Sequence, residues 1–186
     1  EITLKVLPLQ TNTKTIIVSG LALEYSLGIM ESAISSSNDP SGAVFYPDSL
    51  RNNFVFNDLT HPGSITAIRV EGTKTSTEQR INNLIEDLSL IDKNITVLDS
   101  VQSEIFWEDT RSLKVFSKNQ KSILRTVIPA SETINLINRL KPFHPTYFID
   151  WGGSLIWLEL DYLSNQKIDQ IRKRVLDTGG YLTVIK

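Results

Sequence analysis

The same order of strand-like and helix-like segments occurs twice along this chain of 186 residues. Between about residues 14 and 98, the spacing of apolar residues predicts a strand, a helix, two strands, a helix and a strand. The same order follows between about residues 121 and 186, after a helix predicted at about residues 101–115. We therefore predict two tandem βαββαβ units joined by a connecting helix.

Local signals support the helices of both units. Thr75 and Glu78 have the spacing of a capping box, and apolar residues follow at helical intervals through Leu88. Ser131 and Ser164 are predicted to cap the two helices of the second unit. We find no convincing residue identity between the units, so the repeat is one of element order. The predicted class is α+β, with two tandem ferredoxin-like units whose antiparallel sheets are covered by helices.

Two connections between predicted strands raise separate questions. The stretch FIDWGGSLIWLEL, residues 148–160, contains the adjacent Gly152 and Gly153. A phosphate-binding loop would need a helix directly after the glycines, but an aromatic strand follows. We therefore predict a hairpin turn with positive φ, with a close backbone approach to a ligand as the alternative. In the first unit, residues 48–59 are consistent with a hairpin arm that carries Phe54 and Phe56 on one face.

Composition argues against several classes of function. The chain has 19 Lys and Arg against 21 Asp and Glu, so its net charge of -2 provides no electrostatic footprint for nucleic acid. No window approaches the roughly 18 consecutive apolar residues of a membrane-spanning helix. The absence of cysteine removes disulfides and thiolate metal sites and fits a cytoplasmic location. His61 and His144 each precede proline and lack a metal-ligand spacing, so no metal site is predicted.

Candidate binding residues lie on the predicted strands. Arg69 alternates with apolar neighbours and forms a possible charge pair with Glu71, while Arg125 lies on the first strand of the second unit. A buried arginine could hold a carboxylate bidentately, although a solvated sheet face is the more common outcome. The aromatic residues Tyr147, Phe148, Trp151 and Trp157 could stack on a flat ring, but aromatic residues at strand spacing mostly pack in cores and at their rims.

The connecting helix carries more apolar bulk than one stripe accommodates. Ile105 and Trp107 point about 200° apart, so both cannot face one core. One side is expected to pack on this domain and the other to dock on a partner; burial of the whole helix between the units is the alternative. Glu108 and Asp109 are adjacent and cannot jointly flank one substrate atom. Because no nucleophile has a neighbouring base, no catalytic residue is predicted.

Several short motifs occur in an order that resembles a known family. They are TLKVLP at residues 3–8, RVEGT at 69–73, FWEDTRSL at 106–113, LRTVIPAS at 124–131 and DWGGSLIWLEL at 150–160. In this order they resemble the C-terminal cap region of the FAD-binding subunit of glycolate oxidase, in the FAD-linked oxidase superfamily. The resemblance covers nearly the whole chain.

The resemblance implies that residues 1–10 end a missing N-terminal FAD-binding domain and that residues 11–186 form a C-terminal cap and subunit-interaction domain. It implies FAD in the full-length parent and none in this fragment, which is not expected to be catalytic alone. The implied partners are the FAD-binding domain, a catalytic flavoprotein subunit and an iron–sulfur subunit, in a cytoplasmic complex that oxidises glycolate or a similar 2-hydroxy acid; association with a membrane would come through the complex. The residues placed on the flavin side are Arg69, Arg125, Tyr147 and Trp151.

Two other classes of function stay open at this stage. Ferredoxin-like units also serve as stand-alone modules that bind a small molecule or mediate dimer contacts without catalysis, and fold alone does not choose between these uses. An RNA-binding module would need basic aromatic strands, whereas the segments YFIDW and LIWLELD are acidic. The histidine-rich metal motif that is usual in the catalytic flavoprotein subunit has no counterpart around His61 or His144.

Overall fold

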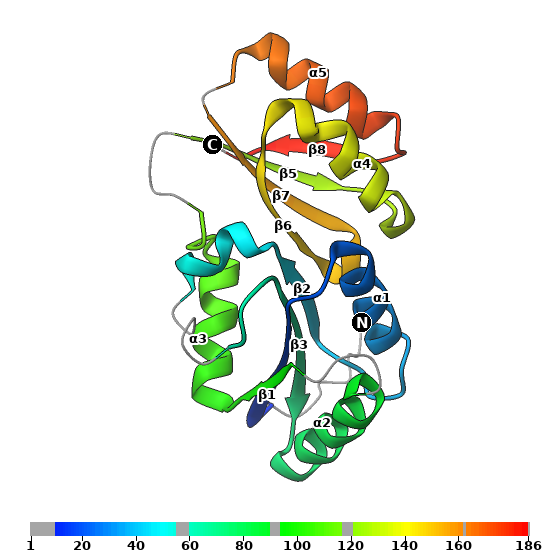
Figure 1. Ribbon diagram of the computed structural model, residues 1–186, viewed down its shortest axis with the longest axis vertical. Coiled ribbons are helices and arrows are strands. Elements are labelled where there is room, and N and C mark those ends of the chain that lie inside the picture. The colour runs from blue at the N-terminus through cyan, green and yellow to red at the C-terminus, as the bar shows by residue number, and fades with distance from the viewer. Residues whose placement is uncertain (1–9, 55–59, 90–93, 117–120, 162, 186) are drawn as a thin grey trace, which may run out of the picture.

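Eight strands form one antiparallel sheet in the computed structural model, which describes residues 10–54, 60–89, 94–116, 121–161 and 163–185. The strand order is β4-β1-β3-β2-β6-β7-β5-β8 (Figure 1). The strands are β1 (Asn12–Ser19), β2 (Gly42–Tyr46), β3 (Ile65–Gly72), β4 (Ile95–Leu98), β5 (Ser122–Val127), β6 (Thr146–Asp150), β7 (Leu155–Leu160) and β8 (Tyr181–Val184). The helices are α1 (Leu23–Ile34), α2 (Lys74–Ser89), α3 (Ser100–Arg111), α4 (Thr133–Leu140) and α5 (Asn165–Leu176).

The two predicted ferredoxin-like units are confirmed, but their sheets are continuous. Each unit places its first strand beside its third and fourth, and all neighbouring strands are antiparallel. The units meet where β2 pairs with β6, with Phe45 opposite Ile149. Each of these strands would otherwise be the edge of its own unit, and an unpaired edge exposes backbone donors and acceptors. Pairing the two edges therefore removes both.

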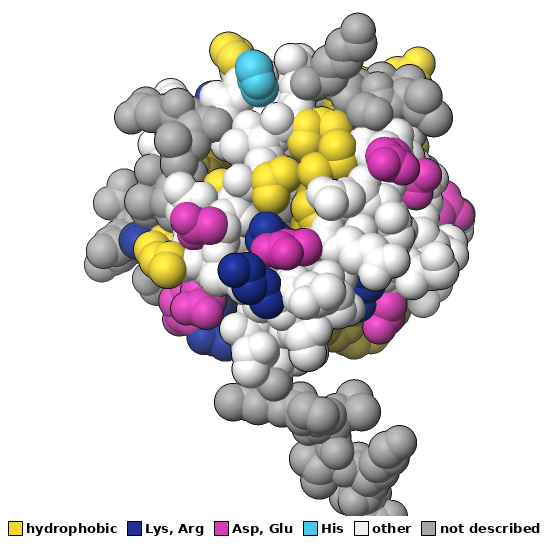
Figure 2. Space-filling view, turned by 90° about the horizontal axis from the view of Figure 1, so that it is seen from below, with side chains coloured by type: hydrophobic (Ala, Val, Ile, Leu, Met, Phe, Trp, Pro, Cys, Tyr) yellow, Lys and Arg dark blue, Asp and Glu magenta, His cyan; other side chains and the backbone are white. Residues whose placement is uncertain are grey.

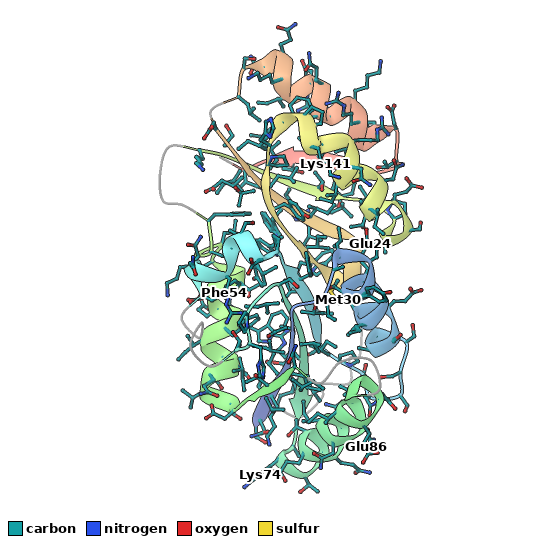
Figure 3. The ribbon with its side chains drawn as sticks, viewed as in Figure 1. Glu24, Met30, Phe54, Lys74, Glu86 and Lys141 are labelled. Atoms are coloured by element: carbon teal, nitrogen blue, oxygen red, sulfur yellow. The ribbon has the colours of Figure 1, made fainter. Side chains whose placement is uncertain are left out.

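The two faces of the sheet have different covers (Figure 1). The helices α1, α2, α4 and α5 lie on one face, whereas α3 lies on the other. Strand alternation divides the core accordingly, because Ile16 of β1 packs in the cluster that includes α1 and α2, and Ile17 packs in the cluster that includes α3. Met30 of α1 and Phe54 mark the two opposite sides in Figure 3.

The second unit is covered more completely on one face than on the other. Leu124 of β5 points toward α4 and α5, where it packs with Leu136 and Ile171. The alternate residues of β5, among them Arg125, lie on the side of α3 and are only half-buried, because α3 covers the first unit. This partly open stretch of sheet, next to α3, forms the floor of the candidate site.

Several predicted helix starts differ from the structure. Helix α2 begins at Lys74, where the Oγ1 atom of Thr73 accepts a hydrogen bond from the Ser76 amide at 3.4 Å, so the predicted capping box at Thr75 is wrong. The helix starts early because β3 ends at Gly72 and the chain turns at once. Ser131 does not cap α4, because it lies in a short 3-10 helix that precedes it.

The cap at the start of α5 is confirmed, since Ser164 accepts a hydrogen bond from the Lys167 amide at 3.4 Å. The connecting helix α3 begins one residue earlier than predicted, after a capping box formed by Asp99 and Gln102, and it ends four residues earlier, at Arg111. The hairpin arm predicted at residues 48–59 is wrong for Asp48–Asn53, which form a 3-10 helix.

Parts of other predictions lie outside the described residues. These are the TLKVLP motif at residues 3–8 and the portion of the predicted arm at residues 55–59. Among the residues that the structure does describe, no helix is long and apolar enough to cross a bilayer.

Candidate functional site

A cavity of about 780 Å³ lies between α3 and the half-open face of the second unit. Its walls come from both units: the ends of β1, β2 and β3, the length of α3, strand β5 and the hairpin that joins β6 to β7. The side chains that dominate its chemistry are Arg69, Trp107, Arg125, Asp150, Trp151 and Trp157.

Arg125 lies at the centre of the aromatic side of this cavity. The pairing of β5 with β7 places it opposite Trp157, and its guanidinium carbon lies 6.0 Å from the centroid of that ring. The same carbon lies 5.4 Å from the ring of Trp151. Within the described part of the chain, no acceptor forms a hydrogen bond or ion pair with this guanidinium. Its planar fork of donors is therefore available to a ligand with paired oxygen atoms.

Arg69 is held more firmly than Arg125. Its Nε donates to the Oγ of Ser41 at 3.0 Å, its Nη2 donates to the Ser41 carbonyl at 3.1 Å, and Nε lies 3.3 Å from Oε2 of Glu71. Its guanidinium also stacks 4.7 Å from the ring centroid of Trp107. The predicted pair with Glu71 is therefore present, and Arg69 contributes a fixed positive charge to the cavity.

Asp150 contributes a carboxyl group whose pKa is affected by the charges of both Arg69 and Arg125. It ends β6, and its Oδ1 accepts a hydrogen bond from the Trp151 amide at 2.7 Å. Burial raises the pKa of Asp150 above its ordinary value, while this amide and the charges of Arg69 and Arg125 act in the opposite direction. The cavity thus contains a half-buried carboxyl group that is influenced by the charges of two arginine side chains.

The connecting helix fixes one wall through Trp107. The indole is only 9% exposed, and its Nε1 donates to the hydroxyl of Thr15 at 2.9 Å. A Cβ atom on Gly42 would lie 3.0 Å from the edge of this ring, so glycine gives the ring its space. Trp107 therefore belongs to the core, whereas Val101 and Ile105 of the same helix are 66% and 40% exposed, and Ile105 also lines the cavity. The prediction that α3 packs with one side only is confirmed.

The glycine pair forms the predicted turn between β6 and β7. Gly152 has a φ of 62° and Gly153 a φ of 111°, values that suit glycine far better than other residues. Trp151 precedes them with a φ of 50°, an uncommon conformation for a large side chain, and it is 59% exposed. The turn therefore holds a large aromatic ring at the border of the cavity.

The structure brings together three of the four residues that the sequence placed on the flavin side. Arg69, Arg125 and Trp151 line one cavity. Tyr147 does not, because it points to the opposite face of the sheet and packs against the core beneath α4 and α5. Burial, followed by the charge of Glu24, raises the pKa of this tyrosine.

Sequence reasoning missed Asp150 and Trp107 as parts of this site, and it left Trp157 out of the residues placed on the flavin side. Strand alternation offered one signal, because Asp150 shares a face with Phe148, which pairs with Trp157 across the hairpin. The acidic residues of α3 behave as predicted and do not act as a pair. Glu108 pairs with Arg111, and Asp109 pairs with Lys114.

Charged side chains are mixed in sign on the face of the molecule that Figure 2 shows. Among the described residues, no group of three His, Asp or Glu side chains is placed to hold a metal ion. Viewed from below, basic and acidic side chains lie side by side, and neither sign forms a broad patch (Figure 2). This mixture agrees with the net charge of -2.

Comparisons with known proteins are informative at the level of the fold. No protein-family model and no curated protein matches the chain. Among solved structures, alkyldihydroxyacetonephosphate synthase is similar in two crystal forms, both 13% identical, with TM-scores of 0.54 and 0.52 over 92% and 91% of this chain. The 4-ethylphenol oxidase from Gulosibacter chungangensis, solved as an isoeugenol complex, is 11% identical, with a TM-score of 0.51 over 92% of this chain.

This chain spans about two fifths of these solved proteins, since it covers 40%, 39% and 43% of their chains. At such low identities the likeness establishes a shared architecture. The two joined βαββαβ units therefore form the same fold as a segment of an alkyldihydroxyacetonephosphate synthase and of a 4-ethylphenol oxidase.

Proposed function

We propose that this chain is the cap domain of an FAD-linked oxidoreductase and that its cavity faces the flavin and the substrate. The observation that carries the proposal is Arg125, whose guanidinium lies in the cavity between two indole rings without a protein acceptor among the described residues. The fold shared with part of an oxidase supports the same assignment. The motif order at residues 69–160 is the further support from the sequence.

The residues of the cavity fit one part of FAD better than another. A flat ring system can lie across the open mouth of the cavity, while the walls formed by Arg125, Trp151 and Leu155 are left for the substrate. The pyrophosphate has no equivalent support from the glycine pair, because strand β7 rather than a helix follows Gly153. This cap would therefore contact the ring, and another domain would hold the pyrophosphate.

The proposed substrate is glycolate or a similar 2-hydroxy acid. Arg125 would bind the carboxylate through its free donors, and Arg69 would add a fixed positive charge. Asp150 would offer an oxygen acceptor for the substrate hydroxyl within the same cavity. Bound flavin would supply the hydride acceptor, whereas these side chains bind and orient the acid.

The proposed setting is a cytoplasmic complex with a catalytic flavoprotein subunit and an iron–sulfur subunit. The exposed side of α3, which carries Val101 and Ile105, would supply a contact with another domain or subunit. Arg69, Arg125 and Trp151 would face the flavin side, and Tyr147 is left out of that set because it lies on the other face of the sheet.

The test is the anaerobic reduction of bound flavin by glycolate in the full-length protein. Arg125→Gln should raise the substrate concentration needed for half-maximal reduction by about tenfold or more, because a charge-assisted pair with a carboxylate is lost. Arg172→Gln on α5 is the matched control, since this arginine pairs with Asp169 away from the cavity. An unchanged concentration dependence in Arg125→Gln would contradict the proposed role of the cavity.

A second measurement concerns the cofactor. We expect the 186-residue chain alone to bind no FAD, because its cavity offers contacts to the ring and none of the described glycine turns cradles a pyrophosphate. A flavin absorption band that persists through gel filtration of this chain would show that the division of contacts between domains is wrong.

A further inference from the structure

The cavity is much larger than a two-carbon acid requires. Its volume of about 780 Å³ lies in the range of about 300–1,000 Å³ that is typical of sites for drug-sized ligands. Glycolate would occupy the surroundings of Arg125 and leave most of the wall without a contact. The size of the cavity therefore indicates a ligand with a body attached to its carboxylate.

The wall next to Arg125 is aromatic and apolar. Trp151 and Trp157 flank the guanidinium, and Leu155 lines the cavity beside them. Trp151 is 59% exposed although it borders a cavity, and the turn holds it at a φ of 50°. Strained backbone at a large exposed ring is typical of positions where a ligand completes the contacts. The flat face of this indole suits a second aromatic ring.

The geometry points to an aromatic 2-hydroxy carboxylate as the ligand of this cavity. Arg125 binds the carboxylate with its free donors, and Trp151 stacks on the aryl group. Asp150 lies in the same cavity and accepts a hydrogen bond from the 2-hydroxyl. The assignment of a hydroxy acid rests on the proposed function, whereas the carboxylate and the aryl group follow from the arginine and the tryptophan.

Arg125, Trp151 and Trp157 lie close together, so one ligand can contact all three side chains. The guanidinium carbon of Arg125 lies 5.4 and 6.0 Å from the centroids of the two indoles, and its N–H edge has no acceptor among the described residues, so that edge can meet a bidentate acceptor. A carboxylate at that edge places its attached carbon chain near the same indoles. An aliphatic acid of the same charge would pair with Arg125 and gain little from Trp151.

The experiment compares 3-phenyllactate with lactate by isothermal titration calorimetry on the full-length protein. These two acids share the 2-hydroxy carboxylate and differ by one phenyl ring. We expect 3-phenyllactate to bind about tenfold or more tightly than lactate or glycolate. Trp151→Ala should remove most of this preference, and Arg125→Gln should weaken the binding of both acids by about tenfold or more.

Two controls keep the experiment decisive. Benzyl alcohol tests the aryl group without a carboxylate and should bind far more weakly than 3-phenyllactate. Arg125→Lys keeps the charge without the planar fork, and it serves if Arg125→Gln unfolds. Thermal melting of each variant checks that the fold is intact. Equal affinity for the two acids, a preference that survives Trp151→Ala, or no binding of either acid would overturn the inference.

The outcome also separates this inference from the proposed function. A preference for 3-phenyllactate without reduction of bound flavin by any hydroxy acid would contradict the oxidation and support the ligand class. Reduction of the flavin by glycolate with no preference for the aromatic acid would support the oxidation and contradict the ligand class.

Discussion

Replacement of Trp107 by alanine tests whether α3 is part of the core of this domain. The indole is 9% exposed and packs in the cluster that includes Phe106, Tyr46 and Phe148. Truncation of a buried tryptophan or phenylalanine to alanine costs about 3–5 kcal/mol of folding free energy, because apolar contacts are lost and a cavity remains. We expect Trp107→Ala to fall in this range.

Two polar contacts place the expected cost toward the upper end. Thr15 is fully buried, and its hydroxyl would lose the hydrogen bond from the Trp107 Nε1. A buried polar group without its partner costs about 1–3 kcal/mol, part of which is already included in the truncation value. Arg69 would lose its stacking partner at 4.7 Å, a contact worth about 0.5–2 kcal/mol. Trp107→Phe keeps most of the ring and should cost less.

The assay is guanidinium unfolding followed by circular dichroism, which does not depend on the fluorescence of the mutated residue. Trp151→Ala is the matched control, because it truncates the same side chain at a position that is 59% exposed. Its effect should stay within about 0.5 kcal/mol. A loss of about 3–5 kcal/mol in Trp107→Ala should lower the melting temperature by roughly 6–20 °C.

The reasoning would be refuted if Trp107→Ala and Trp151→Ala had equal effects on stability. Loss of complex assembly with unchanged melting in Trp107→Ala would likewise contradict the assignment to the core. In that case Trp107 would be a docking residue rather than part of the core.

Three further predictions concern the turn, a buried hydroxyl and the cavity carboxyl. Gly153→Val should cost about 1–3 kcal/mol, because φ is 111° there, while Gly28→Ala, with no atom within 4 Å of the added Cβ, should not destabilise in the same thermal melts. Tyr46→Phe should cost about 1 kcal/mol in urea unfolding, because its hydroxyl donates to Thr110 Oγ1 at 2.8 Å; no loss would mean that the bond adds nothing. Burial raises the pKa of Asp150 in the folded state above the ordinary 3.8, so the folded state binds this proton more tightly than the unfolded state does. The contribution of this carboxyl group to stability therefore falls as the pH rises from the ordinary pKa to the folded pKa. Asp150→Asn should therefore gain stability relative to wild type over the same rise in pH, and a parallel pH dependence of the two proteins would disprove the shift.

The periodicity of the sequence predicted most of the elements because it reflects local geometry. A run of β-branched residues marks β1, a short apolar segment marks β5, and apolar residues recur at helical intervals in α5, so neighbouring residues were enough to predict these elements. The turn at Gly152 and Gly153 was predictable for the same reason, since backbone conformation at two residues decides it. The capping residues were less predictable. Thr73, Thr75 and Ser131 can all cap a helix chemically, but where the preceding element ends decides where each helix begins.

Helix α1 shows where local periodicity is insufficient. Leu23, Leu27, Met30 and Ile34 recur at helical spacing in the sequence, but Ile29 and Ala33 are buried and Ile34 is 48% exposed. The helix packs against both its own sheet and the hairpin of the second unit, where Ile34 lies beside Gly152. Its buried face is therefore determined by two units together.

The sequence by itself determined the class, the order of the elements, the repeat of the βαββαβ unit and the candidates Arg69, Arg125 and Trp151. Only the tertiary structure decided that the two sheets join through β2 and β6, that Tyr147 faces away from the cavity, and that Asp150 and Trp157 belong to it. The physical reason is that side-chain alternation specifies two faces within one strand but not which face of one strand matches which face of another. That match comes from backbone pairing between segments about a hundred residues apart, as when Phe45 meets Ile149.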